Sequence, residues 1–254
     1  FFSKKKKIMS RRSLNNYHRK YFFISLIIEK FLHQKMDKIL TNTISIKKQL
    51  ITTEGVKSNK IKVIPNLLIK KNKNSLRKKL NKSKIRKFGY VANFIPYKNH
   101  LLLIQICSLI KANKDWKLYL IGSDNNGYKN ILKKKVKALG LEKKIYFFNQ
   151  TRNISEFYNK IDFSVSSSSE EGSSNFLLES ITFGLPIIAF NVGGNFEFFQ
   201  NNGFLIPTFD KISMKNAIEH MINNDLKIYS KNSIKVCNNK FNNKKNFQIL
   251  SSQY

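Results

Sequence analysis

The sequence predicts an α/β protein in which a parallel sheet carries helices on both faces, and three observations support this. From about residue 85, short β-like runs alternate with stretches of helix-spaced apolar residues. Gly140 and Gly184 stand where two of the helical stretches end, as C-terminal glycines do. Polar loops follow the β-like runs. Strands separated by helices form βαβ units, whose sheet is parallel and covered on both sides.

The predicted elements of this region follow one another in a regular order. Strands are expected at residues 85–91, 116–121, 144–148, 161–165, 186–190 and 203–206. Helices are expected at residues 98–112, 129–139, 154–159, 175–183, 213–223 and 226–238. Ligands of such sheets bind at the carboxyl ends of the strands. The loops after the first five strands are therefore where any chemistry is expected.

The residues before about 66 are predicted to form a separate unit. Strands at 36–41 and 60–65 flank a helix at 45–53. The apolar run 21–28 predicts a buried or amphipathic helix, because it is far shorter than the ~20 apolar residues of a membrane span.

The composition excludes several classes of protein. The net charge of +32 comes from lysines spread along the chain, and Lys, Asn, Ile and Phe are abundant together, as AT-rich codons favour. We therefore attribute the charge mainly to composition and expect no nucleic-acid partner. Two cysteines make no disulfide framework, so a cytoplasmic protein with reduced thiols is expected. The chain begins Phe-Phe-Ser without an initiator Met, which indicates that its start is missing.

The most informative motif is Glu171 to Glu179, in which two carboxylates stand eight positions apart around a Gly-Ser-Ser-Asn loop. The loop leads into an apolar run that predicts a helix, and the N–H groups of a first helical turn attract phosphate. Carboxylates on either side accept hydrogen bonds from hydroxyl groups. The motif therefore fits a nucleotide sugar, although Ser173, Ser174 and Asn175 also fit an ordinary capped helix with surface glutamates.

Four other loops offer weaker candidates. Lys98 follows the first predicted strand, where a lysine can reach a phosphate, and Asn93 can donate a hydrogen bond to the same group. Gly122 lies in a loop that lacks the spacing of a dinucleotide fold, and a plain turn explains it equally well. Arg152 fits either a nucleobase contact or a surface charge. Gly193-Gly194 permits close backbone approach and is expected to open another helix.

Taken in this order, the five loops resemble the donor-binding domain of the retaining glycosyltransferases of family 4, which have the GT-B fold. The matching residues are 91–100, 122–127, 152–154, 168–179, 184–186 and 193–197, followed by 202–205. The resemblance implies catalytic roles for Glu171, at the donor sugar, and Lys98, at the leaving phosphate. The donor-binding residues that it implies are Asn93, Gly122, Arg152, Ser174, Asn175, Phe176, Leu177, Glu179, Gly193 and Gly194. Of these, Glu179 is expected at the ribose, and the backbone around 175–177 at the diphosphate.

The resemblance also implies the domain organisation. Residues 1–66 are expected to be the C-terminal remnant of a Rossmann-like acceptor-binding domain. Residues 67–84, rich in Lys, Asn and Ser, would then be a linker. Residues 85–238 would be the Rossmann-like donor-binding domain, and 239–254 a C-terminal helix.

The implied reaction transfers a sugar from a nucleotide-sugar donor to a hydroxyl of a glycan or lipid-linked acceptor, with retention, in polysaccharide or cell-envelope synthesis. No metal or other cofactor is expected, and helix 21–31 is the expected contact with the inner face of an anionic membrane. Two departures matter: the family usually has arginine at the position of Asn93, and most of its acceptor domain has no counterpart here. We therefore expect weak donor binding and negligible transfer by this chain alone. A degenerate nucleotide-sugar binder and a nucleotide-sugar epimerase remain the alternatives.

Overall fold

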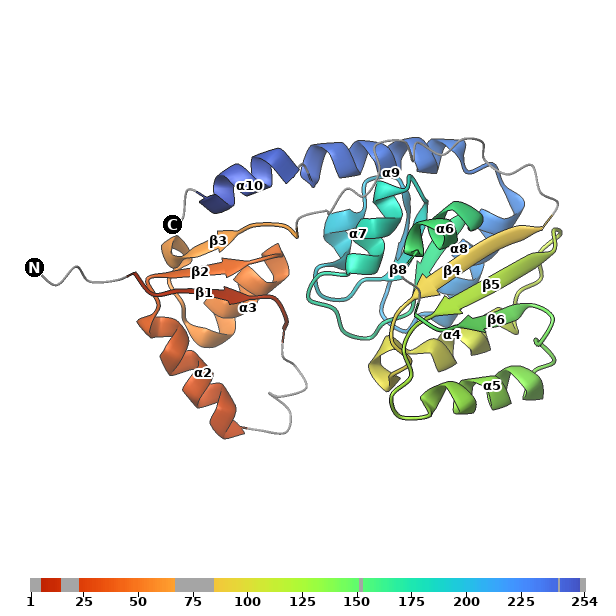
Figure 1. Ribbon diagram of the computed structural model, residues 1–254, viewed down its shortest axis with the longest axis horizontal. Coiled ribbons are helices and arrows are strands. Elements are labelled where there is room, and N and C mark those ends of the chain that lie inside the picture. Colours follow the sequence, from red (N-terminus) through yellow and green to blue (C-terminus); the bar gives the residue numbers. More distant parts are fainter. Residues whose placement is uncertain (1–5, 15–22, 67–84, 151–152, 242, 252–254) are drawn as a thin grey trace, which may run out of the picture.

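Two parallel sheets organise the protein, which is described by a computed structural model. The structure describes residues 6–14, 23–66, 85–150, 153–241 and 243–251. The first unit has a three-stranded sheet of order β1-β2-β3, and the second a six-stranded sheet of order β6-β5-β4-β7-β8-β9 (Figure 1). Every strand pair is parallel. The predicted α/β class is confirmed.

The first unit precedes residue 67. Its elements are β1 (Ile8–Arg11), α2 (Phe23–Lys35), β2 (Lys38–Thr41), α3 (Ile44–Glu54), the 3₁₀ turn η1 (Ser58–Lys60) and β3 (Ile61–Val63). Sequence patterns predicted β2, α3 and β3 but missed β1. The four residues of β1 follow a run of lysines, and they become a strand only because they pair with β2.

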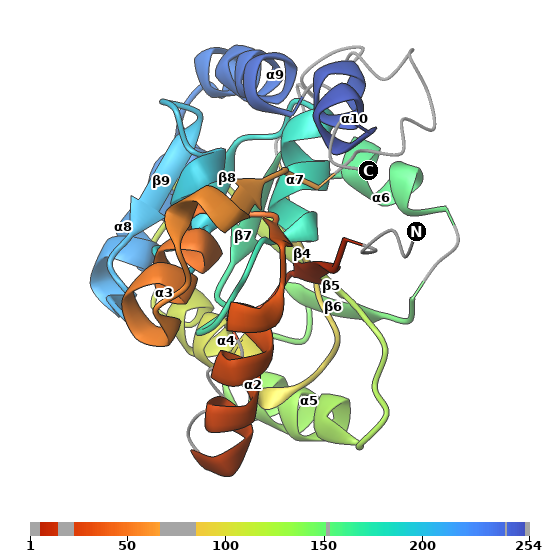
Figure 2. The same cartoon turned by 90° about the vertical axis from the view of Figure 1, so that its left-hand side faces the viewer.

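The second unit begins after the predicted linker, of which residues 67–84 lie outside the described residues. Its first half contains β4 (Arg86–Val91), η2 (Pro96–Lys98), α4 (His100–Cys107), β5 (Trp116–Ile121), α5 (Tyr128–Ala138), β6 (Ile145–Phe148) and α6 (Ile154–Lys160). Its second half contains β7 (Phe163–Ser166), α7 (Asn175–Thr182), β8 (Ile187–Phe190), η3 (Asn195–Phe198), β9 (Gly203–Ile206) and α8 (Lys211–Asn223). Two helices follow, α9 (Lys227–Lys240) and α10 (Asn243–Ser251), and they lie along one side of the molecule (Figures 1 and 2).

The order of the six strands reverses at β4. The chain runs outward from β4 through β5 to β6, then returns to pair β7 with the other side of β4. This reversal is a topological switch point, where open α/β sheets bind ligands beyond their carboxyl ends. The loops that meet there follow β4 and β7. They carry Lys98 and Glu171.

Most predicted element boundaries agree with the structure, and two differ for visible reasons. The helix expected at 98–112 is divided, because Asn99 adopts a left-handed conformation (φ 59°) between η2 and α4. Gly193-Gly194 is followed by the short 3₁₀ turn η3 rather than by an α-helix. Gly140 and Gly184 both have φ of +65°, as expected of glycines that end helices.

Candidate functional site

The candidate site includes the N-terminus of α7. Ser174 caps the helix, because its Oγ accepts a hydrogen bond from the N–H of Leu177 at 3.3 Å. The side chains of Phe176 and Leu177 are buried in the core of the second unit. Phe176, a predicted donor-binding residue, can therefore offer a ligand only its backbone, while the N–H of Leu177, another predicted residue, already donates to Ser174. The cap confirms where the sequence predicted that the helix would begin.

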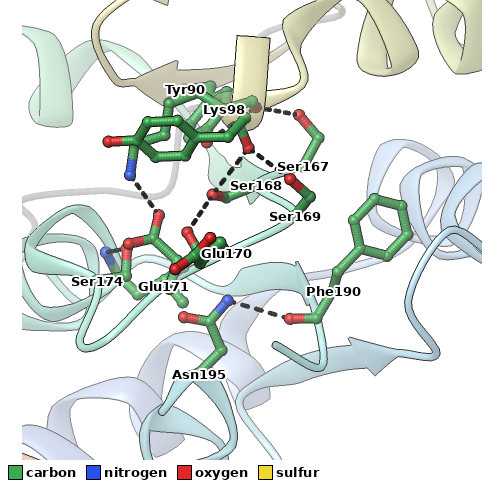
Figure 3. A network of polar contacts seen from close by, with 12 residues as sticks. Tyr90, Lys98, Ser167, Ser168, Ser169, Glu170, Glu171, Ser174, Phe190 and Asn195 are labelled. Atoms are coloured by element: carbon green, nitrogen blue, oxygen red, sulfur yellow. Dashed lines mark hydrogen bonds and ion pairs between the residues drawn. The ribbon is translucent and has the colours of Figure 1, made fainter. Parts of the chain in front are cut away.

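Lys98 and Glu171 meet across the switch point. Nζ of Lys98 lies 2.7 Å from Oε1 of Glu171 (Figure 3). Both side chains are mostly buried. Lys98 comes from η2 after β4, and Glu171 from the loop between β7 and α7. The sequence predicted both residues at strand ends, and the tertiary structure brings them together in front of α7.

A row of hydroxyl groups fixes the backbone that carries Lys98. Ser167 and Tyr90 donate to the carbonyl oxygen of Lys98, each at 3.2 Å. Ser168 and Ser169 donate to the carbonyl oxygen of Tyr97 at 3.3 and 3.0 Å. Burial, and then the charge of Glu171, raises the pKa of Tyr90, so its hydroxyl stays protonated as a donor. These serines come just before Glu171 in the sequence, but no role was predicted for them.

His100 supports this loop as a neutral ring. It is fully buried, and its ring lies 4.9 Å from that of Tyr90 and 5.0 Å from that of Phe94. Burial, followed by the nearby charge of Lys98, lowers its pKa to about 3. The imidazole therefore adds no charge to the site. It acts by packing.

Glu179 lies one turn into α7 and has a partner that the sequence did not indicate. The hydroxyl of Tyr158, on α6, donates to Oε2 of Glu179 at 2.7 Å. The sequence predicted a helix at residues 154–159, which contains Tyr158, but assigned this residue no role. Only the packing of α6 against α7 shows that its hydroxyl reaches the second carboxylate of the motif.

Gly193 and Gly194 pack the second unit against the first. Gly193 has φ of +53°, and a Cβ there would collide with the carbonyl oxygen of Glu171. A Cβ on Gly194 would press on the side chain of Thr43, in the first unit. Both predicted donor-binding glycines therefore stand against the loop of Glu171. Because these glycines have no side chains, the first unit can approach the Glu171 loop closely.

Hydrogen bonds join the two units at the same place. Oε1 of Glu197 accepts from the N–H of Ile44, the first residue of α3, at 2.8 Å. The hydroxyl of Ser45 donates to the carbonyl oxygen of Gly193 at 2.7 Å. Burial raises the pKa of Glu197, while the N–H groups of Ile44 and Ser45 act in the opposite direction. The carboxylate therefore caps a helix of the other unit.

The remaining predicted residues are placed as follows. Asn175, at the start of α7, accepts a hydrogen bond from Asn66 at 2.7 Å. Asn93 accepts one from the hydroxyl of Ser123 at 2.8 Å, and Gly122 lies close against the backbone of Ala92. These last contacts join the loops after β4 and β5. Arg152 lies outside the described residues.

The described part of the chain contains neither a candidate metal site nor a candidate membrane span. No group of three His, Cys, Asp or Glu side chains in these ranges is arranged to hold a metal ion. Within the same ranges, no helix is both long and apolar enough to cross a membrane.

Similarity to solved structures shows the fold. The structure of HepE of Anabaena, solved in complex with UDP and glucose, is similar to this chain, with a TM-score of 0.84 and 19% sequence identity. The alignment covers 98% of this chain and 71% of the HepE chain. The chain has the α/β fold of the GT-B glycosyltransferases.

The sequence then gives the family. Residues 72–236 match the family described as glycosyl transferases group 1, to which this chain belongs. An uncharacterized glycosyltransferase of Haemophilus influenzae is 31% identical over 193 residues, which cover 74% of this chain and 52% of that protein. A poly(ribitol-phosphate) alpha-N-acetylglucosaminyltransferase of Staphylococcus aureus is 25% identical over 142 residues, covering 54% of this chain and 28% of that protein. The chain thus spans about half, or less, of the length of these curated relatives.

Proposed function

We propose that this chain carries the donor site of a retaining glycosyltransferase of family 4, which transfers a sugar from a nucleotide sugar to a hydroxyl acceptor. The observation that carries the proposal is the Lys98–Glu171 ion pair, in which Glu171 belongs to the loop that leads into the capped helix α7. The family match and the UDP and glucose named for HepE support it.

The charges of the site fit a nucleoside diphosphate. The partial positive charge at the N-terminus of α7 and the backbone N–H groups of its first turn favour a phosphate group there. We propose that Lys98 neutralises the phosphate that leaves with the nucleotide. Hydrogen bonds from Ser167, Ser168 and Ser169 hold the backbone of its loop. We expect these groups, rather than a metal ion, to stabilise the leaving group. Sequence reasoning and the family resemblance led to the same expectation.

Glu171 is proposed to hold the donor sugar. Its carboxylate now binds Lys98, so a donor phosphate that binds Lys98 would leave Glu171 able to accept hydrogen bonds from sugar hydroxyls. We favour this positioning role over attack by Glu171 as a nucleophile. The acceptor is proposed to be a glycan or a lipid-linked saccharide of the cell envelope. The support is the poly(ribitol-phosphate) named for the Staphylococcus relative.

Nucleotide binding tests the donor site directly. We expect UDP, GDP or ADP to raise the melting temperature of the protein, and Lys98→Ala to weaken diphosphate binding about tenfold because a charge-assisted contact is lost. The same substitution should weaken the binding of the corresponding nucleoside monophosphate by a smaller factor. Lys117→Ala is the matched control, because Lys117 lies on β5 over the ring of Tyr146. Equal binding by the Lys98 and Lys117 variants would contradict the proposal, as would no binding of any nucleotide.

A nucleotide-sugar binder without transfer activity is the second candidate. It is favoured by Asn93, which stands where related enzymes usually have arginine and whose amide oxygen is occupied by Ser123. The two candidates differ in turnover. Release of UDP from a UDP-sugar in the presence of glycan acceptors, lost on Glu171→Gln, would support the transferase over the binder.

A further inference from the structure

The hydrogen bond between Tyr158 and Glu179 joins two helices of the donor site. Tyr158 is 1% exposed, and its hydroxyl lies 2.7 Å from Oε2 of Glu179. Its ring stacks on Phe183 at 4.8 Å and lies 5.4 Å from the ring of Phe157. Packing against these rings therefore fixes the orientation of the Tyr158 ring and, with it, the position of the hydroxyl.

The direction of this hydrogen bond is fixed. Burial, and then the charge and hydrogen bond of Glu179, raises the pKa of Tyr158 well above its ordinary value. The phenol therefore remains protonated and donates, and the carboxylate accepts. Among the residues that the structure describes, no hydrogen bond occupies the other oxygen of Glu179, Oε1. Since Glu179 is only partly buried, this oxygen remains able to accept from a ligand.

The position of Glu179 relates it to the proposed diphosphate. Glu179 follows Asn175 by four residues, so the two lie on one face of α7, about 6 Å apart along the helix axis. If a diphosphate binds at the first turn, one of the two groups attached to it, the nucleoside or the donor sugar, would therefore lie near Glu179. Glu171, paired with Lys98, belongs to the loop that precedes α7.

We propose that Tyr158 is a positioning residue that makes the site selective for a ribonucleotide. By binding Oε2, it holds the Glu179 carboxylate so that Oε1 accepts hydrogen bonds from the 2′- and 3′-hydroxyls of the ribose. The ligand is thus a nucleoside diphosphate with both ribose hydroxyls. This inference rests on the proposed function, because it takes the nucleotide to bind at α7.

The test compares a nucleotide with and without its ribose hydroxyls. The probe is whichever of UDP, GDP and ADP binds most tightly, together with its 2′,3′-dideoxy form, and calorimetry measures both. The unaltered protein should prefer the ribonucleotide. Tyr158→Phe keeps the ring and removes the hydroxyl, so it should weaken ribonucleotide binding about tenfold and leave dideoxynucleotide binding unchanged.

Two further variants make the result specific. Tyr229→Phe is the matched control, because the Tyr229 hydroxyl bonds His220 at 3.0 Å between α8 and α9, and it should change neither affinity. Glu179→Gln should also reduce the preference for ribose. Adding Tyr158→Phe to Glu179→Gln should then cost little more, because Tyr158 acts through Glu179.

The outcomes separate this inference from the proposed function. If Tyr158→Phe weakens the two nucleotides equally, or weakens neither, Tyr158 only packs α6 on α7 and the inference is overturned. Additive effects of the Tyr158 and Glu179 variants would overturn it as well. If the unaltered protein binds none of the three nucleotides, the proposed function fails, and the inference fails with it.

Discussion

The two units are stabilised in different ways. In the second unit, large buried side chains such as Phe88, Phe163 and Phe190 form a continuous apolar core on both faces of the sheet. In the first unit the apolar core is small, and its members are Ile39, Ile46, Leu50, Val56 and Ile61. The larger core positions the donor site, while the smaller one depends on polar contacts.

A buried ionic cluster accompanies the small core of the first unit. Glu54 is fully buried and pairs with His33 and, at 3.8 Å, with Arg11. Arg11 also binds Glu29 at 3.1 Å. Such a cluster joins β1, α2 and α3, but each charge needs its partner, because an unpaired buried charge is costly. The stability of a unit with few apolar contacts therefore depends more strongly on substitutions of its buried polar residues.

The largest predicted effect on stability comes from a substitution that breaks this cluster. Glu54→Ala should destabilise the first unit by about 3–5 kcal/mol, because it leaves Arg11 and His33 buried without their shared carboxylate. Hydrogen exchange should show faster exchange of the β2 and β3 amides, with β4 and β5 still protected. Glu29→Ala, at a more exposed position, is the control and should cost less than about 1 kcal/mol. An equal loss of protection in both sheets would show that the two units unfold together.

An intermediate effect is predicted where the units meet. Glu197→Ala should cost about 1 kcal/mol, because the N-terminus of α3 loses the carboxylate that caps Ile44. Faster exchange of the Ile44 and Ser45 amides would report the loss. Glu156→Ala, which removes an exposed ion pair with Lys160 and a hydrogen bond from Asn153, both at α6, should leave those amides unchanged.

The same residue predicts a pH dependence. The pKa of Glu197 is raised in the folded protein, so the folded state holds this proton more tightly than the unfolded state. Its contribution to stability is complete below the ordinary value of 4.5 and is lost as the pH rises through the raised value. Glu197→Gln should remove this contribution to the pH dependence of the melting temperature. An unchanged dependence would contradict the assignment.

The smallest effect concerns the surface of the first unit. Helix α2 projects from its sheet (Figures 1 and 2) and exposes Ile28 (54%) and Phe31 (60%) beside basic residues. We predict that this helix binds anionic vesicles, and that Ile28→Ser with Phe31→Ser weakens binding a few-fold in sedimentation assays. Ile131→Ser, at a similarly exposed position on α5, is the control. Equal binding to neutral vesicles would contradict the electrostatic part of the prediction.

Local patterns predicted much of the second unit. Strand β5 at 116–121 and β9 at 203–206 have the predicted boundaries, and α7 begins at the predicted residue. These features depend on neighbours within a few positions, such as the Ser174 cap or the glycine that ends α7. Strand β1 was missed, because its pairing with β2 involves residues about thirty positions away.

The sequence by itself determined the alternation of strands and helices, the capped start of α7, and the candidates Lys98, Glu171 and Glu179. These follow from side-chain periodicity and from the chemistry of single residues, which are local properties. Only the tertiary structure decided that Lys98 binds Glu171, that Tyr158 holds Glu179 and that Glu197 caps a helix of the other unit. Each of these contacts joins residues on different elements, and packing alone determines which polar atoms come within hydrogen-bonding distance.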